Sequence, residues 1–166
     1  PLGGLNALHF LRLAKLTAGE QILIIGAGGS IGLFAVMMAK ALGARVTVVD
    51  KGEKQELLLA HGADETLDFT REDYFSRAER YDVVFSTVAR TPCARALALL
   101  KPGGRYVAAN PTFFDLLRSP FTSLTTGKRL IVALALEKHE ELETLSALLE
   151  SRTIRPIVGH RFAMEQ

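Results

Sequence analysis

Residues 21–50 read QILIIGAGGSIGLFAVMMAKALGARVTVVD, and they carry the strongest signal for the fold. Residues 21–25 are almost all apolar, which is typical of a parallel strand covered on both faces. A glycine turn follows, then an apolar helix over 30–42, and then a second strand over 45–49 that leads directly into Asp50. This order predicts a β-α-β unit whose turn and terminal acid meet at the carboxyl edge of a parallel sheet.

The glycine turn predicts a site for the pyrophosphate of a dinucleotide. Four glycines surround the start of the helix: Gly26, Gly28, Gly29 and Gly32. Unpaired N–H groups and the helix dipole attract a phosphate there, and glycine leaves no Cβ atom in the way. The G-x-G-x-x-G spacing fails from Gly26, because its last position is Ile31. Read from Ala27, with alanine in the place of the first glycine, the spacing continues through Gly29 and ends on Gly32. In this register Ser30 and Ile31 are expected to offer their N–H groups to the pyrophosphate.

Asp50 lies 21 residues beyond Gly29, near the spacing of the acid that binds the adenosine ribose. A carboxylate accepts hydrogen bonds from both ribose hydroxyls and repels a 2′-phosphate, which favours NAD. Lys51 and Lys54 favour NADP, because a cation at this rim can bind the phosphate. Both cofactors therefore stay open, with a slight preference for NAD.

Composition excludes several classes of protein. The net charge of +2 on 166 residues gives no reason to expect nucleic acid or a membrane surface as a partner. No apolar run approaches the roughly 20 residues of a membrane span. Cys93 is the single cysteine, which excludes a disulfide or a thiolate zinc cluster within this chain and fits a reducing cytoplasm. The four histidines lack metal-ligand spacing and are expected at the surface or at helix ends: His9, His61, His139 and His160.

The rest of the chain alternates helices with strands. Helices are predicted over 2–16, 53–61, 92–100 and 137–151, and strands over 65–69, 81–88, 105–109 and 130–136, with a turn at 101–104. Thr70 is predicted to cap a further helix, with Asp73 three residues on. Glutamates of the last helix, including Glu141, are expected on a solvated face. The alternation predicts an α/β fold, a Rossmann-type doubly wound parallel sheet in three layers, α/β/α.

Six segments in order carry a resemblance to a known family: PLGGLNALHFL at 1–11, GAGGSIGLFAVMMAKALGARVTVVD at 26–50, HGADETLDF at 61–69, YDVVFSTV at 81–88, ALALLKPGGRYVAAN at 96–110 and IRPIVGHRFAMEQ at 154–166. The chain resembles the cofactor domain of the medium-chain dehydrogenase/reductase superfamily, and within it the zinc-free, quinone-oxidoreductase-like branch. The resemblance implies one dinucleotide-binding domain over 1–166, within a larger enzyme whose barrel-like catalytic domain lies outside this chain. That enzyme would transfer hydride between NAD(P)H and a quinone, enone, aldehyde or alcohol. This chain alone is expected to bind cofactor, to hold no zinc and not to turn over the small-molecule substrate.

The resemblance and the fold add further candidate contacts. The zinc-free branch often binds NADPH through a lysine, which Lys54 matches, and a tyrosine, which Phe69 replaces without its hydroxyl. Thr87 and Val88 follow a strand and are expected near a ribose of the cofactor, and Asn110 near its nicotinamide end. For Thr87 and Asn110, a role as turn residues that bond to backbone is equally compatible with the sequence.

Two other functions stay open at this point. An S-adenosylmethionine-dependent methyltransferase also has a glycine turn, but it usually carries an acid where this chain has Ile24 and Ile25. A cofactor-sensing module without turnover is the second alternative. A homodimer formed through an apolar edge strand at 130–136 is a further hypothesis.

Overall fold

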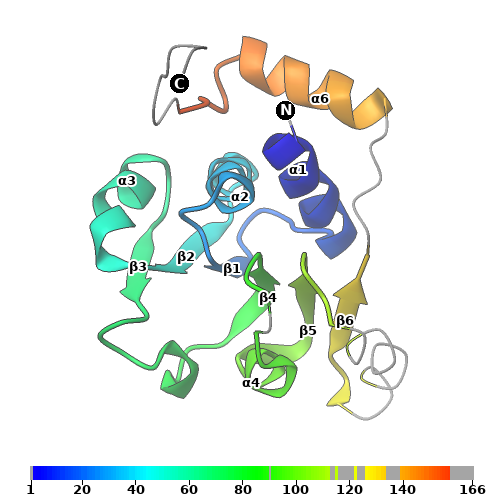
Figure 1. The fold of residues 1–166 in the computed structure, drawn as a ribbon. Coiled ribbons are helices and arrows are strands. Elements are labelled where there is room, and N and C mark those ends of the chain that lie inside the picture. Colours follow the sequence, from blue (N-terminus) through cyan, green and yellow to red (C-terminus); the bar gives the residue numbers. More distant parts are fainter. Residues whose placement is uncertain are drawn as a thin grey trace, which may run out of the picture.

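The computed structural model describes residues 2–89, 91–112, 115, 122, 126–133 and 139–157. In this part of the chain, six parallel strands form one sheet in the order β3-β2-β1-β4-β5-β6 (Figure 1). The strands are β1 Gln21–Ile25, β2 Arg45–Asp50, β3 Glu65–Asp68, β4 Tyr81–Ser86, β5 Leu100–Ala108 and β6 Arg129–Val132. The order of winding reverses between β1 and β4, and their carboxyl ends border the crevice where such sheets bind ligands.

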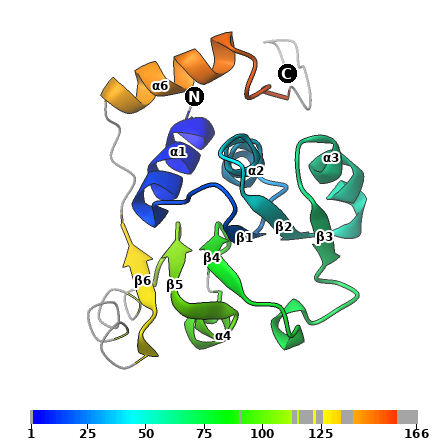
Figure 2. The same cartoon turned by 180° about the vertical axis from the view of Figure 1, so that it is seen from behind.

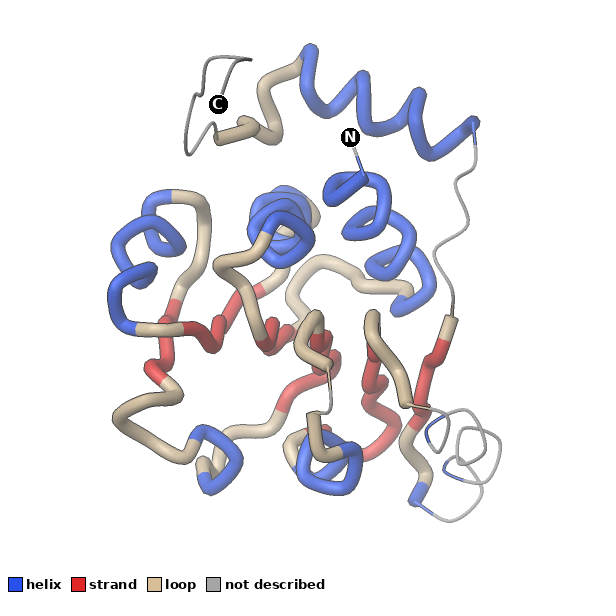
Figure 3. The backbone as a smooth tube through the Cα atoms, in the orientation of Figure 1, coloured by secondary structure: helices blue, strands red, loops and turns tan. Residues whose placement is uncertain are grey.

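Helices cover both faces of the sheet, as Figures 2 and 3 show. One face carries α1 Leu2–Ala14, α2 Ser30–Ala41 and α3 Gln55–Ala60, with α6 His139–Glu150 lying on α1. The opposite face carries α4 Cys93–Ala98 and the 3-10 turn η2 Tyr74–Ser76. Another 3-10 turn, η1 Gly52–Lys54, leads into α3. The predicted α/β fold with three layers is confirmed.

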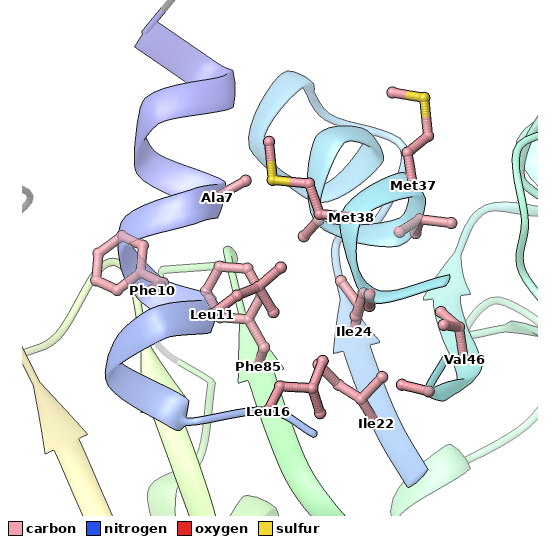
Figure 4. Close-up of a cluster of buried hydrophobic side chains, with 14 of the residues drawn as sticks. Ala7, Phe10, Leu11, Leu16, Ile22, Ile24, Met37, Met38, Val46 and Phe85 are labelled. Atoms are coloured by element: carbon pink, nitrogen blue, oxygen red, sulfur yellow. The ribbon is translucent and has the colours of Figure 1, made fainter. Parts of the chain in front are cut away.

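Apolar side chains alternate along the strands and build a core on each side of the sheet. Ile22 and Ile24 of β1 belong to the core under α1 and α2, whereas Leu23 and Ile25 belong to the core over α4. Figure 4 shows the first core, in which Phe85 of β4 packs with residues of α1 and α2. Both faces of β1 are covered, so the strand is apolar at nearly every position.

The turn expected at 101–104 lies inside β5, where these four residues stand opposite Asp82 alone. Gly103 supplies the positive φ of +75° that this bulge needs. Lys101 Nζ donates to Asp82 Oδ2 at 2.7 Å, and Gln21 N donates to the same oxygen at 2.8 Å. Burial of the Asp82 carboxyl opposes its ionisation, but these hydrogen bonds outweigh burial and lower its pKa.

The helix expected after Thr70 does not form. The Thr70 hydroxyl and N–H both donate to Asp68 Oδ1, at 2.7 and 2.9 Å, so the threonine closes the end of β3 instead of capping a helix. Asp73 is the capping residue, because its side chain accepts from Phe75 N at 3.2 Å. The segment between β3 and β4 therefore contains only the short turn η2.

His9 and Glu141 are both buried, which corrects their expected place at the surface. His9 Nδ1 lies 3.0 Å from Glu141 Oε1, and this contact joins α1 to α6. Gly4 faces Leu145 of α6, where an added Cβ would stand 3.0 Å from Leu145 Cδ1. His9 and Glu141 are 132 positions apart, so their contact depends on the docking of α6 on α1, which local sequence patterns do not contain.

The last predicted elements are only partly described. The strand predicted over 130–136 corresponds to β6, and residues 134–136 lie outside the described residues. The helix predicted over 137–151 corresponds to α6, and residues 137–138 also lie outside them. Between β5 and β6 the structure describes residues 109–112, 115, 122 and 126–128.

Candidate functional site

The glycine turn joins β1 to α2 in the conformation that the Ala27 register predicts. Gly26 has φ +81°, and its N–H donates to Val49 O of β2 at 2.9 Å. A Cβ on Gly32 would stand 2.5 Å from Ala27 Cα, so the first turn of α2 packs directly on the end of β1. Glycine at position 32 is therefore required by close packing of helix and strand.

The start of α2 is open to a ligand. Gly29 is the N-cap of α2, and the first bond into the helix runs from Leu33 N to Gly29 O at 2.9 Å. The N–H groups of Ser30, Ile31 and Gly32 precede that bond and have no partner within the helix. A Cβ on Gly29 would meet only Gly26 O, at 3.7 Å, and Gly29 and Ser30 are both exposed. As far as the described residues show, an anion can therefore approach these donors past Gly29.

Asp50 fastens the glycine turn to the end of β2. The residue is 9% exposed, and its Oδ2 accepts from Gly28 N at 2.7 Å while Oδ1 accepts from Lys51 N at 2.9 Å. An ionised carboxylate has about four acceptor positions. About two positions therefore stay available for ribose hydroxyls beside the turn.

Lys54 lies across the same turn. Its Nζ is 3.6 Å from Asp50 Oδ1 and donates to Gly28 O at 3.3 Å. A Cβ on Gly28 would stand 2.2 Å from Lys54 Cδ, so the aliphatic chain of the lysine covers this glycine. The Lys51 side chain is exposed at the start of η1. Lys54 is thus the cation that partly balances the charge of Asp50.

A cavity of about 550 Å³ opens beside the turn at the carboxyl ends of β1 and β2, and we call it the strand-end cavity. Its lining residues are Ile25, Gly26, Val49, residues 69–75, Val88 and Arg95. Phe69 and Val88 are about half exposed, at 49% and 46%, so each presents an apolar surface to the cavity. A volume of several hundred cubic ångströms with mostly apolar walls is typical of a site for a small molecule or cofactor.

The crossover between β3 and β4 supplies an aromatic wall to the strand-end cavity. The rings of Tyr74 and Phe75 lie 4.2 Å apart between centroids, and the Arg95 guanidinium lies 4.3 Å over the Phe75 ring. Arg95 also forms an ion pair with Asp73. Burial raises the pKa of Tyr74 to about 12, so this wall presents a neutral phenol at physiological pH.

Thr87 and Asn110 lie at the same edge but hold the backbone. The Thr87 hydroxyl donates to Ile25 O and Gly26 O, at 3.1 and 2.9 Å, and Asn110 Nδ2 donates to Thr87 O at 2.8 Å. Neither Thr87 nor Asn110 is among the described residues that line the strand-end cavity. Their side chains thus link the ends of β1, β4 and β5 by hydrogen bonds to the backbone.

The structure brings most of the predicted residues into one place. The turn, Asp50, Lys54, Phe69 and Val88 surround the start of α2 and the strand-end cavity. Sequence reasoning missed Tyr74, Phe75 and Arg95, which line the cavity. The pair of neighbouring aromatics in an otherwise polar segment was the available signal.

No group of three or more His, Cys, Asp or Glu residues in the described part of the structure could hold a metal ion. Among the described helices, none combines the length and apolar character that crossing a membrane requires.

Comparison with known proteins gives one family and many relatives. Residues 30–151 match the family described as zinc-binding dehydrogenase. An NADPH-dependent alkenal/one oxidoreductase of Arabidopsis thaliana is 28% identical over 162 residues, which cover 95% of this chain and 38% of the relative. Among solved structures, the quinone oxidoreductase of Coxiella burnetii aligns with a TM-score of 0.85 at 25% identity, covering 96% of this chain and 50% of that one.

A further solved structure contains a cofactor. The Escherichia coli quinone oxidoreductase complexed with NADPH aligns with a TM-score of 0.79 at 25% identity, covering 96% of this chain and 54% of that one. This chain therefore spans roughly half, or less, of the length of the relatives it matches.

Proposed function

This chain belongs to the zinc-binding dehydrogenase family, and on that premise we propose that residues 1–166 form the cofactor-binding domain of a larger NAD(P)-dependent oxidoreductase. Membership confirms the predicted resemblance to the medium-chain dehydrogenase/reductase superfamily and its quinone-oxidoreductase-like members. The observation that carries the proposal is the open start of α2, bordered by the buried Asp50 and the strand-end cavity. The methyltransferase alternative gains no support from the relatives.

Each part of the site has a role toward a nicotinamide dinucleotide. The N–H groups of Ser30 and Ile31 bind the pyrophosphate, and Gly29 leaves the path open. Asp50 accepts from the adenosine ribose, and the strand-end cavity holds the adenine between Phe69 and Val88. The bound nicotinamide carries the hydride, and the protein fixes its position. Lys51 stands at the rim of this site, and Thr87 and Asn110 keep the strand ends in register.

For the choice between cofactors, we propose NAD with weak discrimination. Asp50 is nine-tenths buried beside the turn, so a 2′-phosphate would approach a carboxylate. Lys54 opposes this effect, because its ammonium lies 3.6 Å from Asp50 Oδ1 and would attract the same phosphate. The names of the Arabidopsis and Escherichia coli relatives include NADPH, and Lys54 is the feature of this chain that would permit NADPH.

The substrate of the larger enzyme is proposed from its relatives. They include an alkenal/one oxidoreductase and quinone oxidoreductases, so we propose a quinone, enone, aldehyde or alcohol as hydride partner. The substrate would bind through a second domain outside this chain. The alternative of a cofactor-sensing module predicts the same cofactor binding without turnover, so activity of the full-length protein distinguishes the two. A place in the cytoplasm stays a prediction from the single cysteine.

A homodimer through β6 is also proposed. β6 is the last strand of the described sheet, next to β5, and its residues Ile131 and Val132 are apolar. An edge of this kind invites pairing with a second copy. Light scattering that gives the mass of one chain would contradict this proposal.

Calorimetric titration of the purified full-length protein with NAD, NADPH and S-adenosylmethionine tests the proposed function. We expect saturable binding of at least one nicotinamide dinucleotide, and stabilisation against heat by RT ln(1 + [L]/Kd). Binding of S-adenosylmethionine alone would contradict the proposal. Oxidation of NADH or NADPH in the presence of a quinone or an enone then tests the activity.

A further inference from the structure

A second cavity lies far from the proposed cofactor site, between α1, α2 and α6, and we call it the three-helix cavity. Its volume is about 360 Å³, which falls within the range of about 300–1,000 Å³ for small-molecule sites. It opens at the carboxyl end of α2, whereas the cofactor site is at the other end of this 12-residue helix. At about 1.5 Å per residue, the two sites are roughly 18 Å apart.

The floor of the three-helix cavity is apolar. Leu8 and Leu11 of α1 and Met38 of α2 contribute buried side chains, and Leu148 of α6 closes one side. Figure 4 shows Met38 reaching from α2 toward α1. Leu42, just after α2, is 48% exposed at the cavity. A linear alkyl chain would bury apolar surface against these side chains, which favours its binding.

The mouth of the cavity carries two positive charges. Arg12 and Lys15 are both exposed, and both line the cavity. Within the described residues neither side chain forms an ion pair, and no carboxylate belongs to the lining. Arg12 donates one hydrogen bond, to Thr144 Oγ1 at 2.8 Å, which leaves other guanidinium N–H groups available.

The charges at the mouth favour an anion. The carboxyl ends of α1, α2 and α6 all reach this cavity, and each carries about half a negative charge. Arg12 and Lys15 supply two full positive charges against that total of about one and a half. The mouth is therefore net positive by about half a charge, beside an apolar floor.

We propose that the three-helix cavity binds a medium-chain aliphatic carboxylate. The alkyl chain lies against Leu8, Leu11 and Met38, and the carboxylate lies between Arg12 and Lys15. The Thr144 hydroxyl lines the same cavity, where it accepts from Arg12 at 2.8 Å and donates to Glu140 O at 2.8 Å, and so holds the guanidinium at the mouth. This site does not depend on the dinucleotide site.

Titration calorimetry of the full-length protein with decanoate, and with decan-1-ol as the uncharged control, tests the proposal. We expect one saturable decanoate site per chain, and binding of decan-1-ol that is at least about tenfold weaker. Saturating NAD should leave decanoate binding unchanged, because the two sites are separate. Displacement of decanoate by NAD would show that the carboxylate binds at the phosphate site, and would overturn the proposal.

Matched variants locate the charge. Lys15 and Arg152 both have positive φ, 51° and 57°, and asparagine tolerates this conformation. Lys15→Asn should weaken decanoate about two- to fivefold, the effect of an exposed ion pair. Arg152→Asn removes a cation outside the cavity and should change nothing. Equal effects of the two variants would contradict the proposed position of the carboxylate.

A blocking variant tests the apolar part. Ala41 is exposed and lines the cavity at the end of α2, so Ala41→Phe fills the space from the mouth without replacing a core residue. We expect this variant to keep its thermal stability and to lose decanoate binding. Undiminished binding in a stable Ala41→Phe protein would place the ligand elsewhere and overturn the proposal.

Discussion

Replacing Asp50 by asparagine should change the choice between NAD and NADP. Asparagine keeps the size of the side chain and an oxygen that can accept from Gly28 N, where the carboxylate accepts at 2.7 Å, but it loses the acceptor for Lys51 N, which the carboxylate binds at 2.9 Å. The variant loses the negative charge toward the ribose hydroxyls. Hydrogen bonds to charged groups contribute about 1.5–3 kcal/mol and neutral ones about 0.5–1.5. NAD should therefore bind roughly tenfold more weakly, since about 1.4 kcal/mol is a factor of ten.

The same change should favour NADP. A carboxylate and one phosphate charge about 5 Å apart repel by roughly 3 kcal/mol at an effective dielectric constant of about 20. Lys54 Nζ, 3.6 Å from Asp50 Oδ1, cancels part of that repulsion. We therefore expect the ratio of NAD to NADP affinity to fall by about 10- to 100-fold in Asp50→Asn.

Titration calorimetry with both cofactors measures this ratio directly. Lys54→Met is the opposing control, because it removes the cation and should raise the preference for NAD. An Asp50→Asn protein with an unaltered affinity ratio would remove Asp50 from the ribose site, and with it the assignment of the adenosine half of the cofactor.

Further changes test other parts of the account. Gly29→Val should lower cofactor affinity more than tenfold with little change in Tm, because its Cβ enters open space while its methyl groups block the phosphate; calorimetry and thermal melts separate the two effects. Gly32→Ala should destabilise the fold by about 1–3 kcal/mol in urea unfolding, because the new Cβ has no room against β1. His9→Ala should lower the free energy of unfolding by about 3 kcal/mol, because the buried Glu141 loses its partner. A loss below about 0.5 kcal/mol, as expected for an exposed residue, would contradict the α1–α6 contact. Asp82 has a lowered pKa, so its stabilisation is present above the usual value of 3.8 and is lost as the pH falls through the lower folded-state value; Asp82→Asn should flatten the acid limb of the stability profile.

The β1–α2–β2 unit could be predicted because its signals are local. An apolar strand, a glycine turn and a terminal acid lie within 30 residues, and each has one interpretation in a parallel sheet. The predicted β1 matches the observed Gln21–Ile25, and Asp50 stands at the end of β2. Gly32 packs on Ala27 as the chosen register requires.

The wall of the strand-end cavity could not be predicted in the same way. Arg95 of α4 meets Phe75 of η2 only after both segments have packed under the sheet. The crossover between β3 and β4 has no helical or strand period in its apolar residues, because η2 is a single turn. His9 and Glu141 illustrate the same limit, since their contact joins the two ends of the described chain.

In the proposed complex, the start of α2 binds a diphosphate while Asp50 holds a ribose. A crystal structure of the full-length protein grown with saturating NAD is the decisive test of both contacts. We predict the pyrophosphate within hydrogen-bonding distance of the Ser30 and Ile31 N–H groups, and a ribose hydroxyl on the Asp50 carboxylate. A dinucleotide bound elsewhere, with the start of α2 facing only solvent, would contradict the account.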